Sequence, residues 1–284
     1  MAFQHLLIER RAGVLEVILD QPEKLNALGI GPGSNREELL AALSMADADD
    51  DVGCVLLRAN GRAFCAGGDL SGARATETPL DEHLFNAELV RFYSTMRATA
   101  KPVVAAVHGL CLGAGLGLMA QCDIVVAADD ARFGLVEGRI GHPGATEIVP
   151  LVGAAWAKFL ILTGELIDAA TARRIGLVLE TTAPQDLTTR CQELARRIAS
   201  MPRAAVLLNK AGISNMNDAM GVAAGRLVGR AYDSLTKSMS AVAKAPDGRT
   251  FADILREEGM TGLKRARDEQ YGGNWLMPKD DKRS

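Results

Sequence analysis

Two glycine-rich segments each combine small residues with available backbone N–H groups at the end of a strand-forming run. The first, Phe64 to Leu70, follows Cys54 to Leu57, and the second, His108 to Gly117, follows Val103 to Val107. N–H groups at turns and helix N-termini are aimed outward, where they bind negative charge. A carbonyl that becomes an oxyanion during a reaction is stabilised by such preorganised donors. The two segments together predict acyl chemistry.

With three further segments, these residues resemble the enoyl-CoA hydratase/isomerase family, also called the crotonase superfamily. The further segments are Pro22 to Leu28, Cys122 to Ala127 and Phe133 to Gly141, and their order and spacing fit throughout. The resemblance implies an α/β fold of the ClpP/crotonase-like type, a spiral of ββα units with a C-terminal helical region. We expect a spiral core over residues 1–200, and helices over 201–284 that serve oligomerisation and pocket closure.

The resemblance places an oxyanion hole at the backbone N–H groups of Gly68 and Ala114. Ala114 would open a helix, so its N–H would also carry the positive end of the helix dipole. Either turn alone is equally well explained as an ordinary strand-to-helix corner, whereas the pair with its flanking matches favours a functional role. A dinucleotide site at Gly113 to Gly117 fits poorly, because the third glycine comes one place early in the fingerprint.

Proton transfer falls, by the same resemblance, to Glu137, which matches one of two catalytic glutamates in the hydratases. A carboxyl group in an apolar pocket has its pKa raised toward neutrality, so it can act as a base and then as an acid. The alternative is a surface carboxylate paired with Arg139. The second hydratase glutamate would fall at Gly117 and is absent. Its loss weakens simple hydration and leaves isomerisation, hydration with another polar helper, or carbon–carbon cleavage.

The segment Gly141 to Glu147 departs by one residue from the usual Gly-x-x-Pro-Gly form. Some relatives place auxiliary acids or bases here, so His142 and Glu147 are candidate helpers. A lone histidine beside a Pro-Gly turn is more often structural, and a glutamate at a helix start is also explained by the helix dipole. If either group activates water, the protein is a C–C bond hydrolase of the retro-Claisen type or a thioester hydrolase. A non-catalytic binding protein is the third reading.

For the CoA part of an acyl-CoA substrate, the resemblance implies a path lined largely by backbone groups of Lys24, Leu25, Ala27, Ala66, Asp69 and Leu70. Lys24 could meet a phosphate or be a solvated loop lysine, and Asp69 is expected to order its loop. A basic stretch near the C-terminus, with Lys264, Arg265 and Arg267, resembles one that relatives bring to the CoA phosphates. The resemblance also implies a homotrimer or homohexamer, with no metal or redox cofactor.

Composition narrows the classes of partner and compartment. A net charge of −3 and the lack of a basic stripe with interleaved aromatics argue against nucleic acid. The five cysteines show no CxxC pair or metal spacing, which indicates free thiols in a reducing cytoplasm. The family resemblance implies a role in fatty acid metabolism. The apolar stretch Val103 to Ala120 contains four glycines, which favour a buried strand and helix over a membrane span. We expect no membrane segment.

Strands must position these groups, and the apolar pattern predicts where they run. Alternation predicts a pair of strands over 6–9 and 14–19, joined by a turn at 11–13. Further strands are expected from Gly53, over 103–107 and over 123–128.

Helices are expected between and after these strands. Ser34 to Glu37 predicts a capping box that opens a helix, and Thr78-Pro79 predicts the start of another that ends before Pro102. Shorter helices are expected over 114–121 and 146–163, and only helices follow Pro202. Phe85, Phe92 and Tyr93 either line the acyl pocket or fill the core, since their helical spacing fits both.

Overall fold

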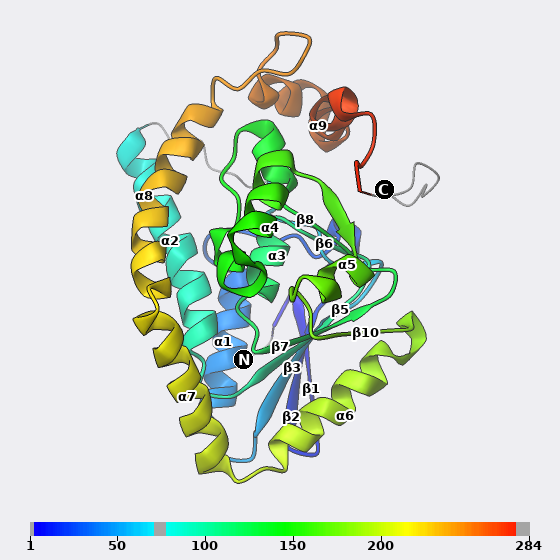
Figure 1. Cartoon of the computed structure of the whole chain (residues 1–284), viewed down its shortest axis with the longest axis vertical. Helices are drawn as coiled ribbons and strands as arrows, with labels where there is room; N and C mark the ends of the chain where they lie inside the picture. Colours follow the sequence, from blue (N-terminus) through cyan, green and yellow to red (C-terminus); the bar gives the residue numbers. More distant parts are fainter. Residues whose placement is uncertain (1–2, 71–77, 277–284) are drawn as a thin grey trace.

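The computed structural model describes residues 3–70 and 78–276, and it contains two sheets (Figure 1). The larger has the strand order β1-β2-β3-β5-β7-β10. Its strands are β1 (Leu6–Arg11), β2 (Val14–Leu19), β3 (Cys54–Ala59), β5 (Val103–Val107), β7 (Ile124–Ala128) and β10 (Glu180–Thr182). β1 and β2 pair antiparallel, which confirms the predicted hairpin, and the remaining neighbours pair in parallel.

The smaller sheet has the order β4-β6-β8-β9. Its strands are β4 (Ala63–Cys65), β6 (Leu110–Leu112), β8 (Arg132–Gly134) and β9 (Leu166–Asp168), and only β9 runs antiparallel to its neighbour. The pairs β3 and β4, β5 and β6, and β7 and β8 follow one another along the chain. Each turn of the chain therefore adds one strand to each sheet, as expected for a spiral of ββα units.

Helices surround both sheets. Within the first two thirds of the chain they are α1 (Asn35–Ala48), α2 (Pro79–Ala98), α3 (Ala114–Met119), α4 (Val149–Thr163), α5 (Ala169–Arg174) and α6 (Leu187–Ala199). Single 3₁₀ turns are η1 (Pro22–Lys24), η2 (Val136–Ile140), η3 (Thr146–Ile148), η4 (Pro184–Asp186) and η5 (Glu269–Tyr271). The last helices are α7 (Arg203–Ala219), α8 (Val222–Ser240) and α9 (Phe251–Asp268). α8 runs alongside α2 (Figure 1). The division of the chain into a spiral core and a helical region at residue 200 stays a prediction.

The central strands of the larger sheet, β2, β3, β5 and β7, are buried on both faces, as is usual for parallel strands. Alternate residues such as Val55 and Leu57 join the main core, whereas Cys54 and Leu56 pack against α6. All five cysteines lie in the described ranges and are free, as predicted. A sheet enclosed in this way holds the turns at its strand ends in fixed positions.

The two predicted helix starts differ in outcome. Thr78 forms a capping box with Asp81 at the start of α2. At α1 the predicted capping box is wrong, because the Ser34 side chain makes no capping bond to a described N–H group. Instead Glu37 accepts a hydrogen bond of 2.6 Å from the N–H of Gly33. Gly33 has a φ of +75°, a conformation that glycine adopts easily. Glu37 therefore accepts from the N–H of Gly33, where a capping box would have it accept from the N–H of Ser34.

Among the described helices, the stretch Thr146–Thr163 is apolar and long enough, by composition, to cross a membrane, and 22% of it is buried. The chain breaks at Gly153, where φ is 73° and ψ is 165°. The straight part after the break is roughly 15 Å long, about half the thickness of a bilayer core. Val103 to Ala120 forms β5, β6 and α3, in agreement with the expected strand and helix.

Candidate active site

The two glycine-rich turns lie against each other at the ends of β4 and β6, which pair in parallel. A Cβ atom at Gly115 would lie 2.4 Å from the carbonyl oxygen of Cys65, and one at Gly67 would lie 3.5 Å from that of Leu112. Position 115 therefore has no room for a side chain, which explains the glycine at this close approach. The fold brings together the two segments that the sequence predicted to act as a pair.

The two candidate oxyanion donors, the N–H groups of Gly68 and Ala114, are not used in the hydrogen bonds of the neighbouring described backbone. The N–H of Leu28 donates to the Gly67 oxygen at 2.8 Å, and the N–H of Asp69 donates to the Leu28 oxygen at 2.9 Å. The N–H of Gly68, between these two residues, takes no part in this pairing. Ala114 is the first residue of α3, where an N–H has no partner within the helix. Neither N–H donates to a residue in the described parts of the chain, so both can serve a bound carbonyl oxygen.

The Glu137 carboxyl group lies directly beside the second turn. Its Oε2 is 3.1 Å from where a Cβ would stand at Gly113, the residue before Ala114. This oxygen is enclosed and has no hydrogen-bond partner among the described residues. Burial raises the pKa of Glu137 to about 7, against a smaller lowering by the Arg267 charge. The group can therefore exchange protons near neutral pH.

Arg139 does not pair with Glu137, so the surface-pair alternative for that glutamate is wrong. The Arg139 guanidinium contacts Glu165 at 3.0 Å and Asp268 at 3.1 Å, and it stacks 3.9 Å from the centre of the Tyr271 ring. Glu165 directly precedes β9, and Asp268 and Tyr271 lie near the C-terminus, so these contacts could not be predicted from spacing along the sequence.

Tyr93 occupies the space beside Gly117, where the second hydratase glutamate was expected and is missing. A Cβ at Gly117 would lie 3.2 Å from both the Cζ and the hydroxyl of Tyr93. The hydroxyl donates to the carbonyl oxygen of Ala114 at 3.2 Å, and burial raises the pKa of the phenol. A side chain at position 117 would require the Tyr93 ring to shift by a few tenths of an ångström, so the glycine leaves room for Tyr93 in its present position. Phe92, by contrast, is buried in the core at 4% exposure, and Phe85 is partly buried.

His142 is held by α8. Lys237 Nζ donates to His142 Nε2 at 2.9 Å. Because an ammonium group only donates, Nε2 accepts and the ring proton belongs on Nδ1. Burial, with the Lys237 charge, lowers the pKa of His142 to about 4. A neutral imidazole of this low basicity is a poor general base near neutral pH.

Glu147 lies in the single turn η3 and belongs to a group of carboxyls near Glu137. Burial raises the pKa of Glu147, while the charge of Arg226 opposes this. Its charge raises the pKa of Glu137, and it also adds to the burial that raises the pKa of Asp233 to about 6. The sequence did not indicate that Asp233 is a partly buried carboxyl near the site. Polar and apolar residues are mixed along α8, and its buried face is defined only by packing on α2.

The predicted CoA path is an interlocked pair of loops. Lys24 contacts Asp69 at 3.1 Å, and Ala66 N–H donates to the Leu25 oxygen at 3.0 Å. Ala27 N–H donates to the Lys24 oxygen, and Leu70 packs on the cluster around Ile140. A cavity of about 250 Å³ adjoins these loops, lined in part by Lys24, Ile30, Pro32 and Asp69. Of the six residues of the predicted CoA path, Lys24 and Asp69 line this cavity.

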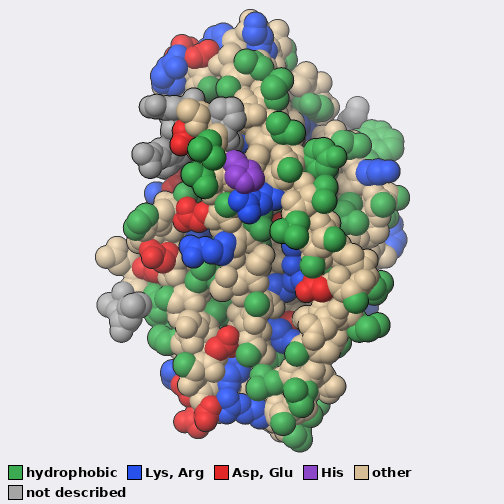
Figure 2. Space-filling view, turned by 90° about the vertical axis from the view of Figure 1, so that its left-hand side faces the viewer, with side chains coloured by type: hydrophobic (Ala, Val, Ile, Leu, Met, Phe, Trp, Pro, Cys, Tyr) green, Lys and Arg blue, Asp and Glu red, His purple; other side chains and the backbone are tan. Residues whose placement is uncertain are grey.

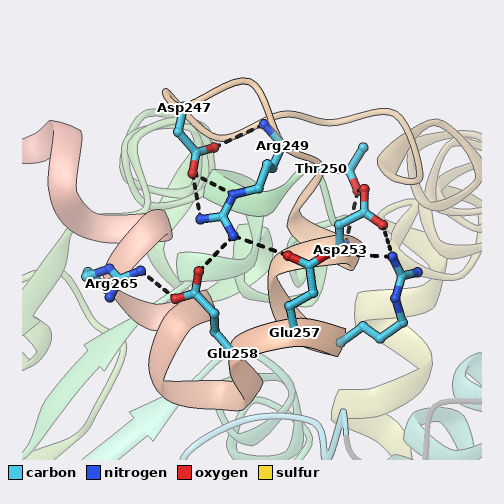
Figure 3. A network of polar contacts seen from close by, with 8 residues as sticks. Asp247, Arg249, Thr250, Asp253, Glu257, Glu258 and Arg265 are labelled. Atoms are coloured by element: carbon cyan, nitrogen blue, oxygen red, sulfur yellow. Dashed lines mark hydrogen bonds and ion pairs between the residues drawn. The ribbon is translucent and has the colours of Figure 1, made fainter.

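Arg265, in the basic stretch near the C-terminus, belongs to an ion network with the loop before α9 (Figure 3). Arg249 contacts Asp247 at 2.7 Å and Glu258 at 2.7 Å, and Glu258 contacts Arg265 at 2.5 Å. Thr250 caps α9 by accepting from the N–H of Asp253. The network ties the loop before α9 to the helix, which packs on η2. Of the basic residues named from sequence, Arg267 is the one whose charge acts on Glu137.

Sequence reasoning also missed Arg36. It lies on the buried face of α1 with Leu39, Leu43 and Ala46, and it is only 7% exposed. The signal was available, since an arginine at positions i−3 and i−7 from two core leucines breaks an apolar stripe.

Comparison with known proteins decides the family. The model of the enoyl-CoA hydratase/isomerase family matches residues 9–238. The chain belongs to this family. A probable enoyl-CoA hydratase, echA8, of Mycobacterium bovis is 33% identical over 218 residues, covering 75% of this chain and 82% of the relative. The crotonyl-CoA hydratase of Syntrophomonas wolfei is 30% identical over 279 residues, covering 95% of this chain and 99% of that protein.

Solved structures agree with the fold of this enoyl-CoA hydratase/isomerase family member. An enoyl-CoA hydratase/isomerase from Xanthobacter autotrophicus Py2 superimposes with a TM-score of 0.86 at 27% identity, covering 95% of this chain and 99% of that chain. An enoyl-CoA hydratase from Mycobacterium smegmatis gives a TM-score of 0.84 at 28% identity, covering 98% and 97%. The crotonase-type spiral and its C-terminal helices are therefore shown, and enoyl-CoA hydratase-type function is supported at the level of the family.

Proposed function

We propose that this protein acts on acyl-CoA thioesters, with Gly68 and Ala114 binding the thioester oxygen and Glu137 transferring the proton. The observation that carries the proposal is the position of Glu137. Its enclosed Oε2 lacks a partner among the described residues and lies beside Gly113, one residue before a candidate donor. A carboxyl group next to the oxyanion donors is placed to act on the carbon adjacent to the thioester carbonyl.

The proposed chemistry follows from these two parts. The N–H groups of Gly68 and Ala114 donate to the thioester oxygen, which becomes negative as an enolate forms. Glu137 in its carboxylate form removes the proton from carbon and then returns it as an acid. A pKa of about 7 populates both forms near neutral pH. Only a proton moves and the N–H donors hold the charge, so we propose no cofactor other than the CoA of the substrate.

Isomerisation, or hydration with a helper group, suits this arrangement best, because Tyr93 fills the place of the second carboxylate. The hydrolase alternative now depends on Glu147, since Lys237 and burial make His142 a poor base. A non-catalytic binding protein is the less favoured alternative, because it does not explain why the enclosed Oε2 of Glu137 has no described partner. Leaving a buried polar group without a hydrogen bond lowers the stability of the fold.

We propose further that a homotrimer or homohexamer forms through the outer faces of α7 and α8. These helices expose large apolar side chains, namely Leu208, Ile213, Met216, Met220, Leu227, Val228, Tyr232, Leu235 and Met239. Figure 2 shows this side of the molecule, with apolar side chains spread over much of the face. Light scattering on the purified protein measures the assembly, and a monomer would contradict it. A cytoplasmic location remains part of the proposal.

A panel of saturated, 2-enoyl and 3-enoyl CoA thioesters tests the function. We expect CoA to bind in calorimetry, and at least one enoyl-CoA to change in absorbance and product mass. Absence of binding by CoA and by every acyl-CoA would remove the proposal and favour a free carbonyl substrate.

A further inference from the structure

Arg36 is a buried cation for which the described chain supplies no counter-ion. Its side chain lies 5.4 Å from the centre of the Phe92 ring, and its Nε and Nη1 are enclosed without a hydrogen-bond partner. A cation over a ring face is stabilised through that face, but its N–H groups still need acceptors. Arg36 makes no ion pair with any residue in the ranges 3–70 and 78–276. The guanidinium is therefore short of acceptors.

Another arginine shows what this chain does when a guanidinium has only a structural role. Arg139 also has a buried side chain, 6% exposed, and it donates to the Thr163 carbonyl at 3.0 Å and to Glu165 at 3.0 Å. Burying a charge without hydrogen bonds is unfavourable, so a guanidinium like that of Arg36 is expected to meet an acceptor in some state of the protein.

Arg36, on α1, lies against the ring of Phe92 on α2, and the centre of that ring is 5.1 Å from the centre of the Tyr93 ring. Its charge acts on the thiol of Cys65 and on the hydroxyl of Tyr93, lowering the pKa of each against the larger effect of burial. Cys65 touches the start of α3 at Gly115, and Tyr93 touches Gly117 and the carbonyl of Ala114. Contacts through Phe92 and Tyr93 therefore link Arg36 to Ala114, the proposed oxyanion donor at the start of α3.

We infer that Arg36 binds a carboxylate at the far end of the acyl group, so that the substrate is an enoyl-CoA with a terminal carboxylate. The inference rests on the proposed function and names its substrate class. A carboxylate matches the planar donor fork of a guanidinium and supplies the charge that Arg36 lacks. The Phe92 ring lies against the guanidinium, 5.4 Å from ring centre to Cζ. A plain alkyl chain would leave the cation without an acceptor.

The test compares 2-enoyl-CoAs that end in a carboxylate with their methyl esters and with crotonyl-CoA, over a series of chain lengths. For the wild type we expect kcat/KM to favour one of the carboxylates over its ester. Arg36→Met should lower kcat/KM for that carboxylate by about 10- to 100-fold, as expected for the loss of a charge-assisted pair, and change crotonyl-CoA little. Arg36→Lys, which keeps the charge without the fork, should recover part of the loss.

Thermal unfolding separates this role from a structural one. Arg36→Met should keep or raise the unfolding midpoint, because removing Arg36 leaves no described polar group without its hydrogen-bond partner. Arg36→Gln provides a polar variant for the same comparison of rates. Equal use of carboxylates and esters by the wild type, or an equal loss for every substrate in Arg36→Met, would overturn the inference while leaving the proposed function intact. Failure of every enoyl-CoA and of CoA to bind would overturn both.

Discussion

Two regions of this molecule bury charged side chains, and they treat them in opposite ways. At the base of the larger sheet, Lys101 is 1% exposed and donates to the carbonyl oxygens of Asp49 at 2.9 Å and Val52 at 2.6 Å. Glu16 is equally buried and accepts from Arg58 at 2.8 Å and from Gln192 at 2.8 Å. In this region each buried charge has its hydrogen bonds.

Around the oxyanion turns the described chain leaves buried donors and acceptors unmatched. Glu137 Oε2 and the Nε and Nη1 of Arg36 are enclosed without partners. Proteins violate the rules of polar satisfaction mainly where function requires it. The contrast supports the proposal that a ligand supplies the missing partners at the turns, whereas the fold itself supplies the partners at the sheet base.

The largest effect is expected from Glu137→Gln, which keeps shape and removes the base. Turnover of an accepted acyl-CoA should fall by roughly a hundred to ten thousand-fold, with KM moved much less. Steady-state kinetics measures both quantities.

Glu165→Gln is the matched control, since Glu165 is a buried carboxylate that accepts from Arg139 at 3.0 Å and from the N–H of Trp275 at 2.6 Å. It should lower the free energy of unfolding by about 2 kcal/mol and spare most activity. If Glu137→Gln lost stability while Glu165→Gln lost activity, the assignment of Glu137 to the site and of Glu165 to the fold would be contradicted.

Ala114→Pro should produce the next largest effect. The substitution deletes one proposed oxyanion donor at the first position of α3, which tolerates proline. The expected loss in kcat is about 100- to 1000-fold, with CoA binding retained in calorimetry. Ala114→Gly keeps the N–H and serves as the control. A folded Ala114→Pro protein with full activity would show that the oxygen is held elsewhere.

The pH dependence of stability sharpens the comparison further. The pKa of Glu137 rises from 4.5 to about 7 on folding, so between these values the folded chain holds more protons than the unfolded chain. Its contribution is therefore most favourable below pH 4.5 and is lost as the pH rises through 7, by roughly 3 kcal/mol at most. Urea unfolding at several pH values should show this loss in the wild type and not in Glu137→Gln. Parallel curves for the two proteins would contradict the raised pKa.

The smallest effect is expected at the sheet base. Lys101→Met leaves the carbonyls of Asp49 and Val52 without their donor, which should cost about 2 kcal/mol of unfolding free energy. Activity per folded molecule should stay near that of the wild type. Urea denaturation alongside kinetics measures both, and a loss of turnover without a loss of stability would place Lys101 in the functional region.

The sequence predicted most of the elements because their signals are local. The strand alternation before and after Gly13 and the cap at Thr78 each depend on residues a few places apart. The glycine-rich segments predicted the turns, because the close approach at Gly115 excludes every side chain. The cap at Ser34 failed because a neighbouring glycine with positive φ offered a competing N–H.

What the sequence could not predict are contacts between distant elements. Tyr93 beside Gly117 joins α2 to α3, and Lys237 on His142 joins residues 95 places apart. Arg36 was invisible as an unmatched charge until the packing of α1 on α2 enclosed it. Periodicity shows which face of a helix is buried, but it does not show which polar group on that face will lack a partner.

Hydrogen exchange at carbon tests the central assignment most directly. When an acyl-CoA that binds is incubated with the wild type in deuterium oxide, mass spectrometry should show deuterium entering at the α or γ carbon. Glu137→Gln should lose this exchange while still binding CoA, and His142→Ala and Glu147→Gln should retain it. Exchange that persists in Glu137→Gln but disappears in Glu147→Gln would contradict the account and move the chemistry to the segment after η2.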